Sequence, residues 1–538
     1  MRDTLHALKP PPISMNTSAG ARPDYENYSV LSRWIVLAAV VLGAILEILD
    51  TTIVSTAIPQ MQGNLGATLD EIGWVSTGYI VANVIVLPLT GWCAARFGRR
   101  QYLAASMAFF TIASFMCGIS GSLWGLVFWR IMQGAGGAAL ISTAQATLLS
   151  IFPPKQHNMV QGIFGLSIMV APTLGPTIGG YITDQYSWPW AFFVNVPLGI
   201  IGVMLVLSYL KDDENQRVPG KVDAFGIALL AVGLGCLQTV LEKGNREDWF
   251  ESNLIVALTI LAVTGLGSFV WWELKTDSPA VNLRILKNRA FTAGWILNFV
   301  VGIGLYVSVF IFPVFMQSLR GYTAQETGMQ LIPRGLTTAI VTIMTIRLAS
   351  KIQPRLMLGV GLVLFSIAML YFHSITLTTG PDQLLWPMII TGASFGMLIV
   401  PLSAATLGAL QPREIPAGAG LFNLMRQLGG SVGIASAATV LDHWGQQARA
   451  PMVEAITPLN PAWALRLETM SRAFQNSGLD APTAQSRAYA LMERMIEAQS
   501  ATIAFEKAYY ALAVLALVAI PLLFLFKNVK GAPSAEAH

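Results

Sequence analysis

Long apolar segments alternate with short polar segments along most of the chain, from Trp34 to Phe526. A helix that crosses a lipid bilayer needs about 20 predominantly apolar residues. Stretches of that length recur fourteen times, so the pattern predicts an all-α polytopic membrane protein with fourteen transmembrane helices. The predicted spans are residues 33–58, 72–95, 102–121, 123–150, 158–183, 190–210, 223–242, 253–273, 290–318, 326–348, 354–374, 384–408, 417–441 and 506–527.

The polar segments indicate which side of the membrane each loop occupies, because Lys and Arg accumulate in cytoplasmic loops. If residues 1–32 form a disordered cytoplasmic tail, the short outer loops carry only Lys243, Arg246 and Arg320. The even number of spans then returns the final tail, residues 531–538, to the cytoplasm. No apolar segment precedes Trp34, so we expect no cleavable signal peptide.

Composition excludes several classes of function. Of the 538 residues, 54% are hydrophobic and 12% are charged, whereas a soluble domain has about 25% charged residues. The net charge of +4 is too small to indicate nucleic-acid binding. The three cysteines lie in apolar runs without paired spacing, so we expect neither a disulfide nor a metal site. The sequence has no GxxxxGK[ST] or HExxH motif, which argues against an ATP-driven pump or a membrane enzyme and predicts no cofactor.

The chain contains an internal repeat. Residues 137–153 match residues 396–412 at a shift of 259, and Gly137 and Pro153 recur as Gly396 and Pro412. Repeated halves are typical of secondary transporters, whose substrate site lies between the halves near the bilayer midplane. Chance similarity between apolar helices is the alternative interpretation.

This repeat suggests a division into domains. Six-helix bundles at residues 33–210 and 276–530 leave two inserted helices within residues 211–275. The second bundle then includes a long outer loop, residues 443–505.

Two carboxylates, Glu47 and Asp50, interrupt the first predicted span and share one helix face. Ionised at the bilayer centre, each costs about 2.5–3.5 kcal/mol on an insertion scale. Burial and a neighbouring carboxylate both favour the protonated form of such a group. The pair is therefore our candidate for proton coupling, although hydrogen bonding to neighbouring helices is a structural alternative.

The fourth predicted span contains Arg130, a cation that keeps its charge. With a helical rise of 1.5 Å per residue, Arg130 lies about 10 Å below the outer edge of the membrane. Asp50 lies about 12 Å below the same edge. Matching depths predict an Asp50–Arg130 ion pair, with Gln133 one turn along as a candidate substrate-binding residue. The following GAGGAA segment (134–139) lacks the preceding strand of a dinucleotide fingerprint and favours close helix packing.

Two glycine-rich motifs are candidates for segments that change conformation. Residues 171–180, APTLGPTIGG, suggest a hinge or a tight interface between the halves, with packing alone as the alternative. The loop of residues 91–100, GWCAARFGRR, suggests a cytoplasmic gate whose arginines bond helix C-termini, with plain positive-inside charge as the alternative. The candidate residues are Gly175, Pro176, Gly179 and Gly180 in the first motif and Gly91, Arg96, Gly98, Arg99 and Arg100 in the second.

Further candidates for substrate binding lie in the second half. Asn423 and Arg426 are three residues apart in a predicted span, where an arginine suggests function by default. Arg334 fits a functional role and a structural role equally well. An aromatic and Met-rich segment ends the ninth span and would suit an adaptable apolar pocket or ordinary packing. Its candidate residues are Phe312, Phe315 and Gln317.

Taken together, these motifs resemble the fourteen-span drug:proton antiporters of the major facilitator superfamily, and in particular the EmrB-type branch. The resemblance rests on LDTTIVSTAIP, the loop ending RFGRR, the span 4 arginine with QGAGGAA, GPTIGG and WPWAFFVNVPLG (188–199), and covers residues 33–530. It implies the major facilitator fold and export of small hydrophobic compounds in exchange for protons across the bacterial inner membrane. The family usually has Asp at the position of Ala95, so a charge-based latch is in doubt.

The resemblance also implies partners, a periplasmic adaptor and an outer-membrane channel. Apolar stripes in residues 463–474 and 489–503, and the absence of Gly and Pro from 483 to 520, predict that the last helix starts outside and projects about 30 Å. The outer loop is then either a docking surface for the adaptor or a lid on the transporter itself. Alternative functions are export of one endogenous metabolite, siderophore or fatty acid, and a non-transporting sensor or scaffold.

Overall fold

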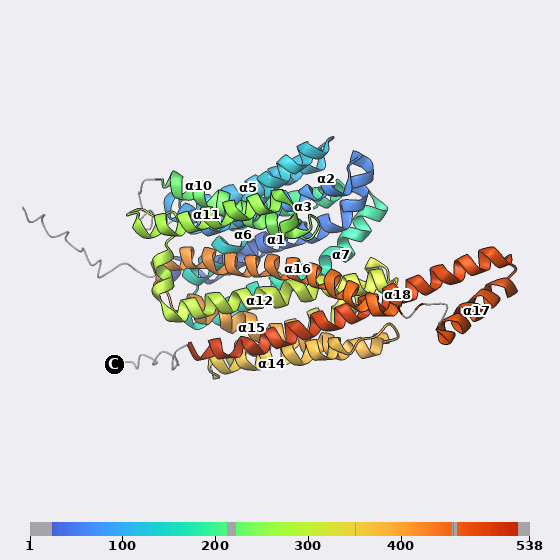
Figure 1. The fold of residues 1–538 in the computed structure, drawn as a ribbon. Helices are drawn as coiled ribbons and strands as arrows, with labels where there is room; N and C mark the ends of the chain where they lie inside the picture. The colour runs from blue at the N-terminus through green and yellow to red at the C-terminus, as the bar shows by residue number, and fades with distance from the viewer. Residues whose placement is uncertain (1–23, 212–221, 350, 455, 457–459, 526–538) are drawn as a thin grey trace, which may run out of the picture.

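The computed structural model describes residues 24–211, 222–349, 351–454, 456 and 460–525, and every regular element in these ranges is a helix (Figure 1). The predicted all-α class is confirmed. Twelve helices in this part of the chain are long and apolar enough to cross a membrane. Two other long helices, α7 (His157–Gln185) and α16 (Ile415–Glu454), lie in the same bundle. The count of fourteen spans therefore stays a prediction.

The first half of the chain supplies helices that run back and forth along one axis. A short 3-10 turn, Leu87–Leu89, joins α3 to α4 without interrupting their common span. In order along the chain these helices are α1 (Val30–Leu65), α2 (Leu69–Ile72), α3 (Trp74–Val86), α4 (Thr90–Phe97), α5 (Arg99–Gly118), α6 (Leu123–Ile151), α7, α8 (Trp190–Phe193) and α9 (Asn195–Tyr209).

The remaining helices follow the same up-and-down course. A π-helical turn, Phe315–Leu319, extends α12, and a 3-10 segment, Ile520–Leu525, follows α18. These helices are α10 (Ala224–Lys243), α11 (Asn253–Lys275), α12 (Arg289–Val314), α13 (Ala324–Leu348), α14 (Pro354–His373), α15 (Pro381–Leu407), α16, α17 (Pro461–Asn476) and α18 (Ala481–Val518).

The first helix begins earlier than the sequence pattern predicts. The Ser29 side chain accepts a hydrogen bond from the Ser32 amide, which caps α1 at Val30 rather than at residue 33. The Tyr28 hydroxyl donates to the Lys211 carbonyl at 3.1 Å. The last residues assigned to the N-terminal tail are therefore ordered against the end of α9. Residues 1–23 and 531–538 lie outside the described residues.

Helix packing groups α1–α9 on one side and α12–α16 with α18 on the other, and we call these groups the N-half and the C-half. Within the N-half α1 packs on α6, α7 and α9, and within the C-half α12 packs on α16 and α13 on α15. The halves meet where α7 contacts α13 and α15, and where α16 contacts α4 and α6. This arrangement is the major facilitator fold expected from the sequence.

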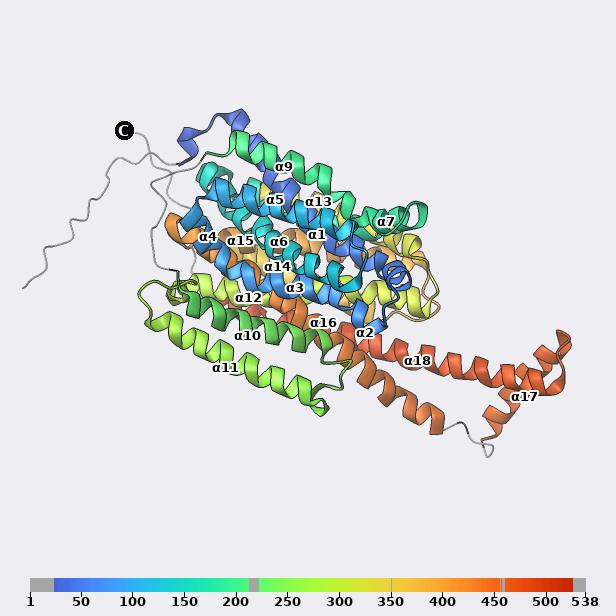
Figure 2. The same ribbon diagram turned by 90° about the horizontal axis from the view of Figure 1, so that it is seen from above.

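The helices α10 and α11 form a separate pair on the flank of the molecule (Figure 2). They pack on each other, and α10 also packs on α3 of the N-half and α16 of the C-half. Gln238 of α10 donates to Ser431 Oγ of α16 at 2.9 Å. The pair therefore lies across the side of the junction between the halves.

A helical arm projects from one end of the bundle (Figure 1). It consists of the end of α16, all of α17 and the first half of α18, which begins at Ala481, close to the start of the stretch without Gly and Pro at residue 483. Packing of α17 on α18 buries Ala484, Ala488 and Met492. The arm extends away from the rest of the helical bundle and does not fold back over its end (Figure 1).

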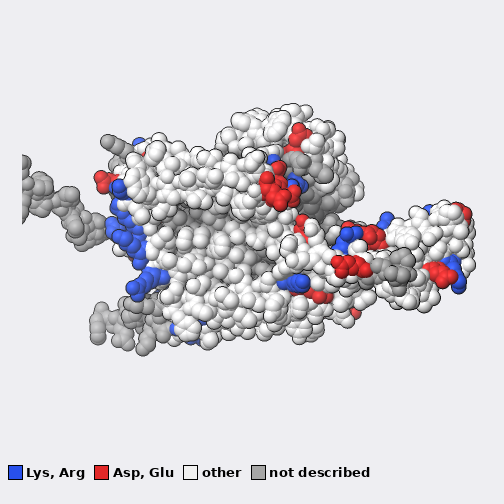
Figure 3. Space-filling view, viewed as in Figure 1, with Lys and Arg blue, Asp and Glu red and all other residues white. Residues whose placement is uncertain are grey.

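Basic residues collect at the end of the bundle opposite the arm (Figure 3). We call it the basic end. It includes the α4–α5 junction, with Arg96 and Arg100, and the start of α14, with Arg355. The asymmetry agrees with the positive-inside pattern read from the loops.

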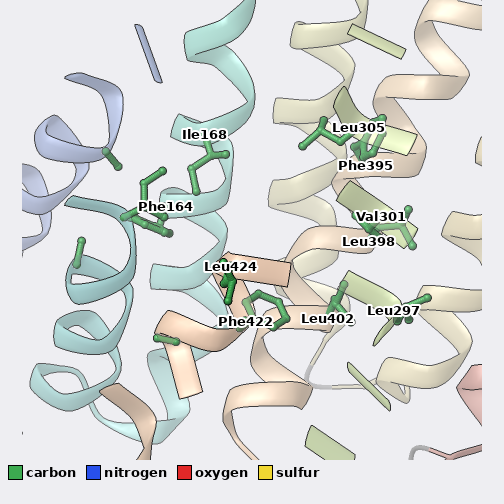
Figure 4. Close-up of a cluster of buried hydrophobic side chains, with 14 of the residues drawn as sticks. Phe164, Ile168, Leu297, Val301, Leu305, Phe395, Leu398, Leu402, Phe422 and Leu424 are labelled. Atoms are coloured by element: carbon green, nitrogen blue, oxygen red, sulfur yellow. The ribbon is translucent and has the colours of Figure 1, made fainter. Parts of the chain in front are cut away.

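Apolar side chains fill the middle of the molecule between the halves (Figure 4). Phe164 and Ile168 of α7 face a group from the C-half that includes Val301, Leu402 and Phe422. All five residues are no more than 6% exposed. The two halves therefore share one continuous apolar core in this conformation.

Candidate substrate and proton-coupling site

Asp50 and Arg130 form an ion pair inside the N-half, as their matching depths predict. Arg130 Nη1 lies 2.6 Å from Asp50 Oδ2, and the two side chains are 1% and 0% exposed. The other carboxylate oxygen, Oδ1, accepts hydrogen bonds from Gln133 at 2.9 Å and from Asn195 at 2.8 Å. Three donors from α6 and α9 thus compensate the charge of one carboxylate on α1.

Arg130 is held in place by groups on three sides. Its Nε donates to the Val75 carbonyl at 3.0 Å, and its Nη1 also donates to Gln133 Oε1 at 2.8 Å. The guanidinium carbon lies 4.2 Å from the centre of the Tyr79 ring, a cation–π contact. Breaking the ion pair would therefore disturb contacts among α1, α3, α6 and α9.

Sequence reasoning missed Asn195 as a part of this cluster. It is fully buried, and its Nδ2 also lies 3.1 Å from Ser114 Oγ. Asn195 belongs to the segment WPWAFFVNVPLG, where a single amide stands in an apolar run. That isolated amide was the available signal, because buried polar side chains need hydrogen-bonding partners.

Glu47 lies one turn before Asp50 on α1 but has much less compensation. Its Oε1 accepts a hydrogen bond from Asn83 at 2.9 Å, whereas Oε2 has no partner among the described residues. The side chain is 7% exposed. Glu47 is therefore a buried carboxylate with one oxygen that has no partner in the described part of the chain.

A small cavity of about 20 Å³ lies between the halves. It is far smaller than the roughly 300–1,000 Å³ of a typical pocket for a drug-sized ligand. The conformation is therefore closed around this cavity, and a substrate must separate the halves to enter. The lining residues are Gln145, Gln161, Phe164, Gly165, Ile168, Asn298, Val301, Leu305, Ile399, Leu402, Ser403, Phe422, Asn423 and Arg426.

A chain of amides bridges the halves at the cavity. Asn423 of α16 donates to Gln145 Oε1 of α6 at 2.9 Å, and Gln145 donates to Gln161 Oε1 of α7 at 3.0 Å. Gln161 Nε2 and Arg426 Nε have no hydrogen-bond partner among the described residues. These unsatisfied donors face a space where a polar group of a substrate would find partners.

Only two of the expected substrate-binding residues, Asn423 and Arg426, line the cavity. Gln133 belongs to the Asp50 cluster. Phe312 and Phe315 pack against Phe372 and Phe505 of the C-half. Gln317 is exposed in the π-helical turn. The helical register of α12 turns these aromatic side chains toward α14 and α18, so their assignment to the cavity is not supported in this conformation.

The glycines of α7 make a tight contact within one half rather than between the halves. A β-carbon at Gly175 would overlap Thr52 of α1, and one at Gly179 would overlap Thr56. Gly180 faces open space. In this conformation Gly175 and Gly179 therefore contact α1 of the same half, and the role of the motif as a hinge or as an interface between the halves stays a prediction. Pro176 lies in the same helical turn.

The loop of residues 91–100 places two of its arginines at the ends of helices, as the sequence suggests, while its role as a cytoplasmic gate stays a prediction. Arg100 donates to the Leu207 carbonyl near the end of α9, and Arg99 donates to Ser150 near the end of α6. Both contacts stay within the N-half, whereas Arg96 is exposed. Gly98 adopts a positive φ of 88° between α4 and α5, a conformation that favours glycine.

The halves touch at the basic end through closely spaced backbone atoms. A β-carbon at Gly91 would lie 2.5 Å from the Ala417 Cα of α16, and one at Gly420 would lie 2.9 Å from the Leu87 carbonyl oxygen. Only glycine at residue 91 allows the two helices to approach this closely. The basic end is therefore closed in this structure without a carboxylate at Ala95.

Comparisons with known proteins agree with this architecture. Residues 40–434 match the family model of the Major Facilitator Superfamily. Multidrug export protein EmrB of Escherichia coli K12 is 35% identical over 429 residues, which cover 79% of this chain and 84% of that protein. Fatty acid resistance protein FarB of Neisseria gonorrhoeae is 32% identical over 497 residues, which cover 92% and 96%.

A solved structure shows a similar fold at low sequence identity. The proton:xylose symporter XylE from E. coli is 13% identical, with a TM-score of 0.57 over 93% of this chain and 96% of that chain. This similarity supports a common helix arrangement alone.

Proposed function

The chain belongs to the major facilitator superfamily, and from this premise we propose that it is a multidrug efflux transporter that exports hydrophobic compounds in exchange for protons. The 35% identity to the multidrug export protein EmrB supports efflux of diverse compounds. The fold and family are those of a transporter, and the protein is not an enzyme.

The observation that carries proton coupling is the buried Asp50–Arg130 ion pair. Protonation of Asp50 would remove the charge that holds Arg130 and loosen contacts among four helices. Deprotonation would restore the pair. A proton on Asp50 can therefore change the relative stability of two conformations, which is the requirement for coupled transport.

Glu47 is our candidate for a second proton. Exchange of one proton for a monovalent cation moves no net charge, whereas a second proton makes one net charge cross the membrane. At 100 mV that charge is worth about 2.3 kcal/mol, which sustains a gradient of roughly forty-fold. The unpartnered Oε2 of Glu47 is available to carry that proton.

Transport in proteoliposomes tests the coupling. We expect an inward proton gradient to drive export of a cationic dye by the wild-type protein, and Asp50→Asn to abolish this stimulation. Glu47→Gln should lower the measured proton-to-dye ratio while dye transport persists. Glu71→Gln, at a partly exposed residue outside the site, serves as a control. Absence of any proton-stimulated transport by the wild type would refute the proposal.

Export of fatty acids is the second candidate, because FarB is a fatty acid resistance protein and its match covers 92% of this chain. Arg426 supports it, since an unsatisfied guanidinium donor at the cavity suits a carboxylate. A susceptibility panel of dyes, antibiotics and long-chain fatty acids in a deletion strain separates the candidates. If the deletion strain is sensitive to long-chain fatty acids but not to dyes or antibiotics, the result favours export of fatty acids.

We also propose that the arm docks a periplasmic adaptor that leads to an outer-membrane channel. This places the protein in the bacterial inner membrane with both termini in the cytoplasm. Apolar side chains exposed on the arm support a protein partner. They are Val453, Leu465, Tyr489, Leu491 and Met495, each at least 38% exposed.

Two substitutions on the arm test this docking. Leu465→Glu with Tyr489→Glu should abolish resistance in cells while proton-driven transport in proteoliposomes stays unchanged. Thr469→Glu, on an exposed position of α17, is the matched control for added charge. Normal resistance in the double variant would contradict an adaptor at this surface.

A further inference from the structure

A groove with one charged end runs along the flank of the C-half, near the basic end. It lies between the start of α14 and the end of α18, two helices that pack against each other (Figure 1). Its volume is about 550 Å³, compared with about 20 Å³ for the cavity between the halves. A typical ligand pocket measures roughly 300–1,000 Å³. The groove can therefore hold a ligand in a conformation whose central cavity is closed.

The local sequence explains why the two helices leave this space open. The α-helix α18 ends at Val518, and Pro521, which has no amide hydrogen to donate, lies in the 3-10 segment that follows. On α14, Gly359 has no side chain, and an added β-carbon would meet Leu523 Cδ1 at 3.5 Å, an ordinary contact distance. A glycine on one wall and a change of helix type on the other therefore form the groove.

The walls of the groove are apolar and face outward from the bundle. Both α14 and α18 are long and apolar enough to cross a membrane. Leu356, Val360 and Val363 line the groove from α14, and each is at least 40% exposed. Ile520 and Leu523 line the opposite wall. Lipid tails are as apolar as these side chains, so the surroundings of the groove in the membrane are acyl chains rather than water.

The charge at one end of the groove comes from Arg355, in the first turn of α14. Its guanidinium carbon lies 4.1 Å from the centre of the Phe524 ring, and no acidic side chain pairs with it in the described part of the chain. A guanidinium can bind a phosphate through two parallel hydrogen bonds. A cation without an acidic partner beside an apolar groove therefore matches a molecule with a phosphate at one end and an acyl chain at the other.

We propose that this groove binds an anionic phospholipid. The headgroup phosphate lies at Arg355, and one acyl chain follows α14 past Gly359 to Val363, a length of about 12 Å at 1.5 Å per residue. An anionic headgroup is favoured over a zwitterionic one, because a headgroup ammonium would repel the guanidinium. The other basic side chains that collect at this end also attract anionic lipids (Figure 3).

The bound lipid would connect the start of α14 to the segment that follows α18. Arg355 and Gly359 are on α14, and Leu523 and Phe524 are on the 3-10 segment Ile520–Leu525. None of these residues contributes to the Asp50 cluster or lines the cavity between the halves. Lipid binding can therefore be measured without a transported substrate or a proton gradient.

The test is native mass spectrometry of the purified full-length protein, titrated in detergent with phosphatidylglycerol or phosphatidylethanolamine. We expect one phosphatidylglycerol to bind the wild type about fivefold more tightly than phosphatidylethanolamine, which corresponds to about 1 kcal/mol for one arginine near an anionic headgroup. Arg355→Gln should remove this preference and leave binding of phosphatidylethanolamine unchanged. Gly359→Leu places a side chain in the groove and should abolish the tight binding of both lipids.

Matched variants separate this site from general effects of charge and size. Lys155→Gln removes a charge between α6 and α7, and Gly267→Leu adds a side chain on α11 where a β-carbon meets nothing within 4 Å. Both should bind like the wild type. Equal wild-type affinity for the two lipids, or a preference that survives in Arg355→Gln, would overturn the proposal. Glycerol 3-phosphate binding as tightly as the lipid would overturn it in favour of phosphate alone, and a dimer lost in Gly359→Leu in favour of a second copy of the chain.

Discussion

Two acids on one helix face have different surroundings, and this difference defines their expected roles. Asp50 receives three donors and has both oxygens occupied, whereas Glu47 has one oxygen bonded and one without a partner in the described structure. Removing one member of a buried ion pair is more damaging than removing both, because the remaining charge stays uncompensated. The two sites therefore respond differently to neutralisation.

For Asp50 we predict that stability and transport can be separated. Asp50→Asn leaves Arg130 unpaired and should lower the free energy of unfolding by about 3–5 kcal/mol. Asp50→Asn combined with Arg130→Gln removes both charges and should recover most of that loss. Melting curves measure the stability, and proton-driven dye transport should stay absent in both variants. Transport restored in the double variant would show that the pair is structural only.

For Glu47 we predict little change in stability. Glu47→Gln keeps an oxygen that can accept from Asn83, and no formal ion pair is lost. Its melting temperature should stay close to that of the wild type. A loss as large as that of Asp50→Asn would indicate that Glu47 is ionised and essential for packing.

At the scale of elements, close helix contacts depend on particular glycines. In α7 the residues Gly175 and Gly179 face Thr52 and Thr56 of α1, whereas Gly180 faces open space. The three positions share one motif and differ only in what an added methyl group would meet. They therefore form a natural set of test and control substitutions.

We predict that Gly179→Ala destabilises the protein by about 1–3 kcal/mol through overpacking against Thr56. The matched variant Gly180→Ala should be neutral or stabilising by about 0.5–1 kcal/mol, because alanine is the better helix former. Adding Thr56→Ala to Gly179→Ala should recover part of the lost stability, because the Ile53 backbone still lies 3.0 Å from the added carbon. Thermal unfolding measures all three, and equal effects at both glycines would exclude the packing explanation.

At the scale of the whole molecule, the structure is closed at the basic end. Its central cavity measures about 20 Å³, and the backbone of α4 meets that of α16 at Gly91 and Ala417. A transporter that takes substrate from the basic side must separate these helices. The energy of this contact therefore helps to determine which conformation predominates.

We predict that Gly91→Ala shifts the population toward a conformation open at the basic end. The added β-carbon has backbone atoms within 3 Å and no flexible side chain to displace. Spin labels at Arg96→Cys and Arg413→Cys, in a background without the native cysteines, should report a longer distance. Gly63→Ala, where nothing lies within 4 Å of the added carbon, is the control. An unchanged distance in Gly91→Ala would contradict this account of the closure.

The local pattern of the sequence was sufficient to predict those features that depend only on residues close to one another in the chain. The apolar segments predicted the helical class, the spacing of Glu47 and Asp50 placed them on one face, and equal depth predicted the contact with Arg130. The start of α18 followed from a long stretch without Gly or Pro. These features are local because the bilayer sets the length, direction and depth of each helix.

Contacts between distant helices were decided by the tertiary structure alone. The pairing of Asn195 with Asp50, the turn of Phe312 and Phe315 away from the cavity, and the contact of Gly91 with Ala417 all depend on helix rotation and on which helices become neighbours. A sequence pattern shows that a face is apolar or polar, but in a membrane protein most faces are apolar. Close packing of small residues and partners for buried polar groups, rather than hydrophobicity, determine which faces meet.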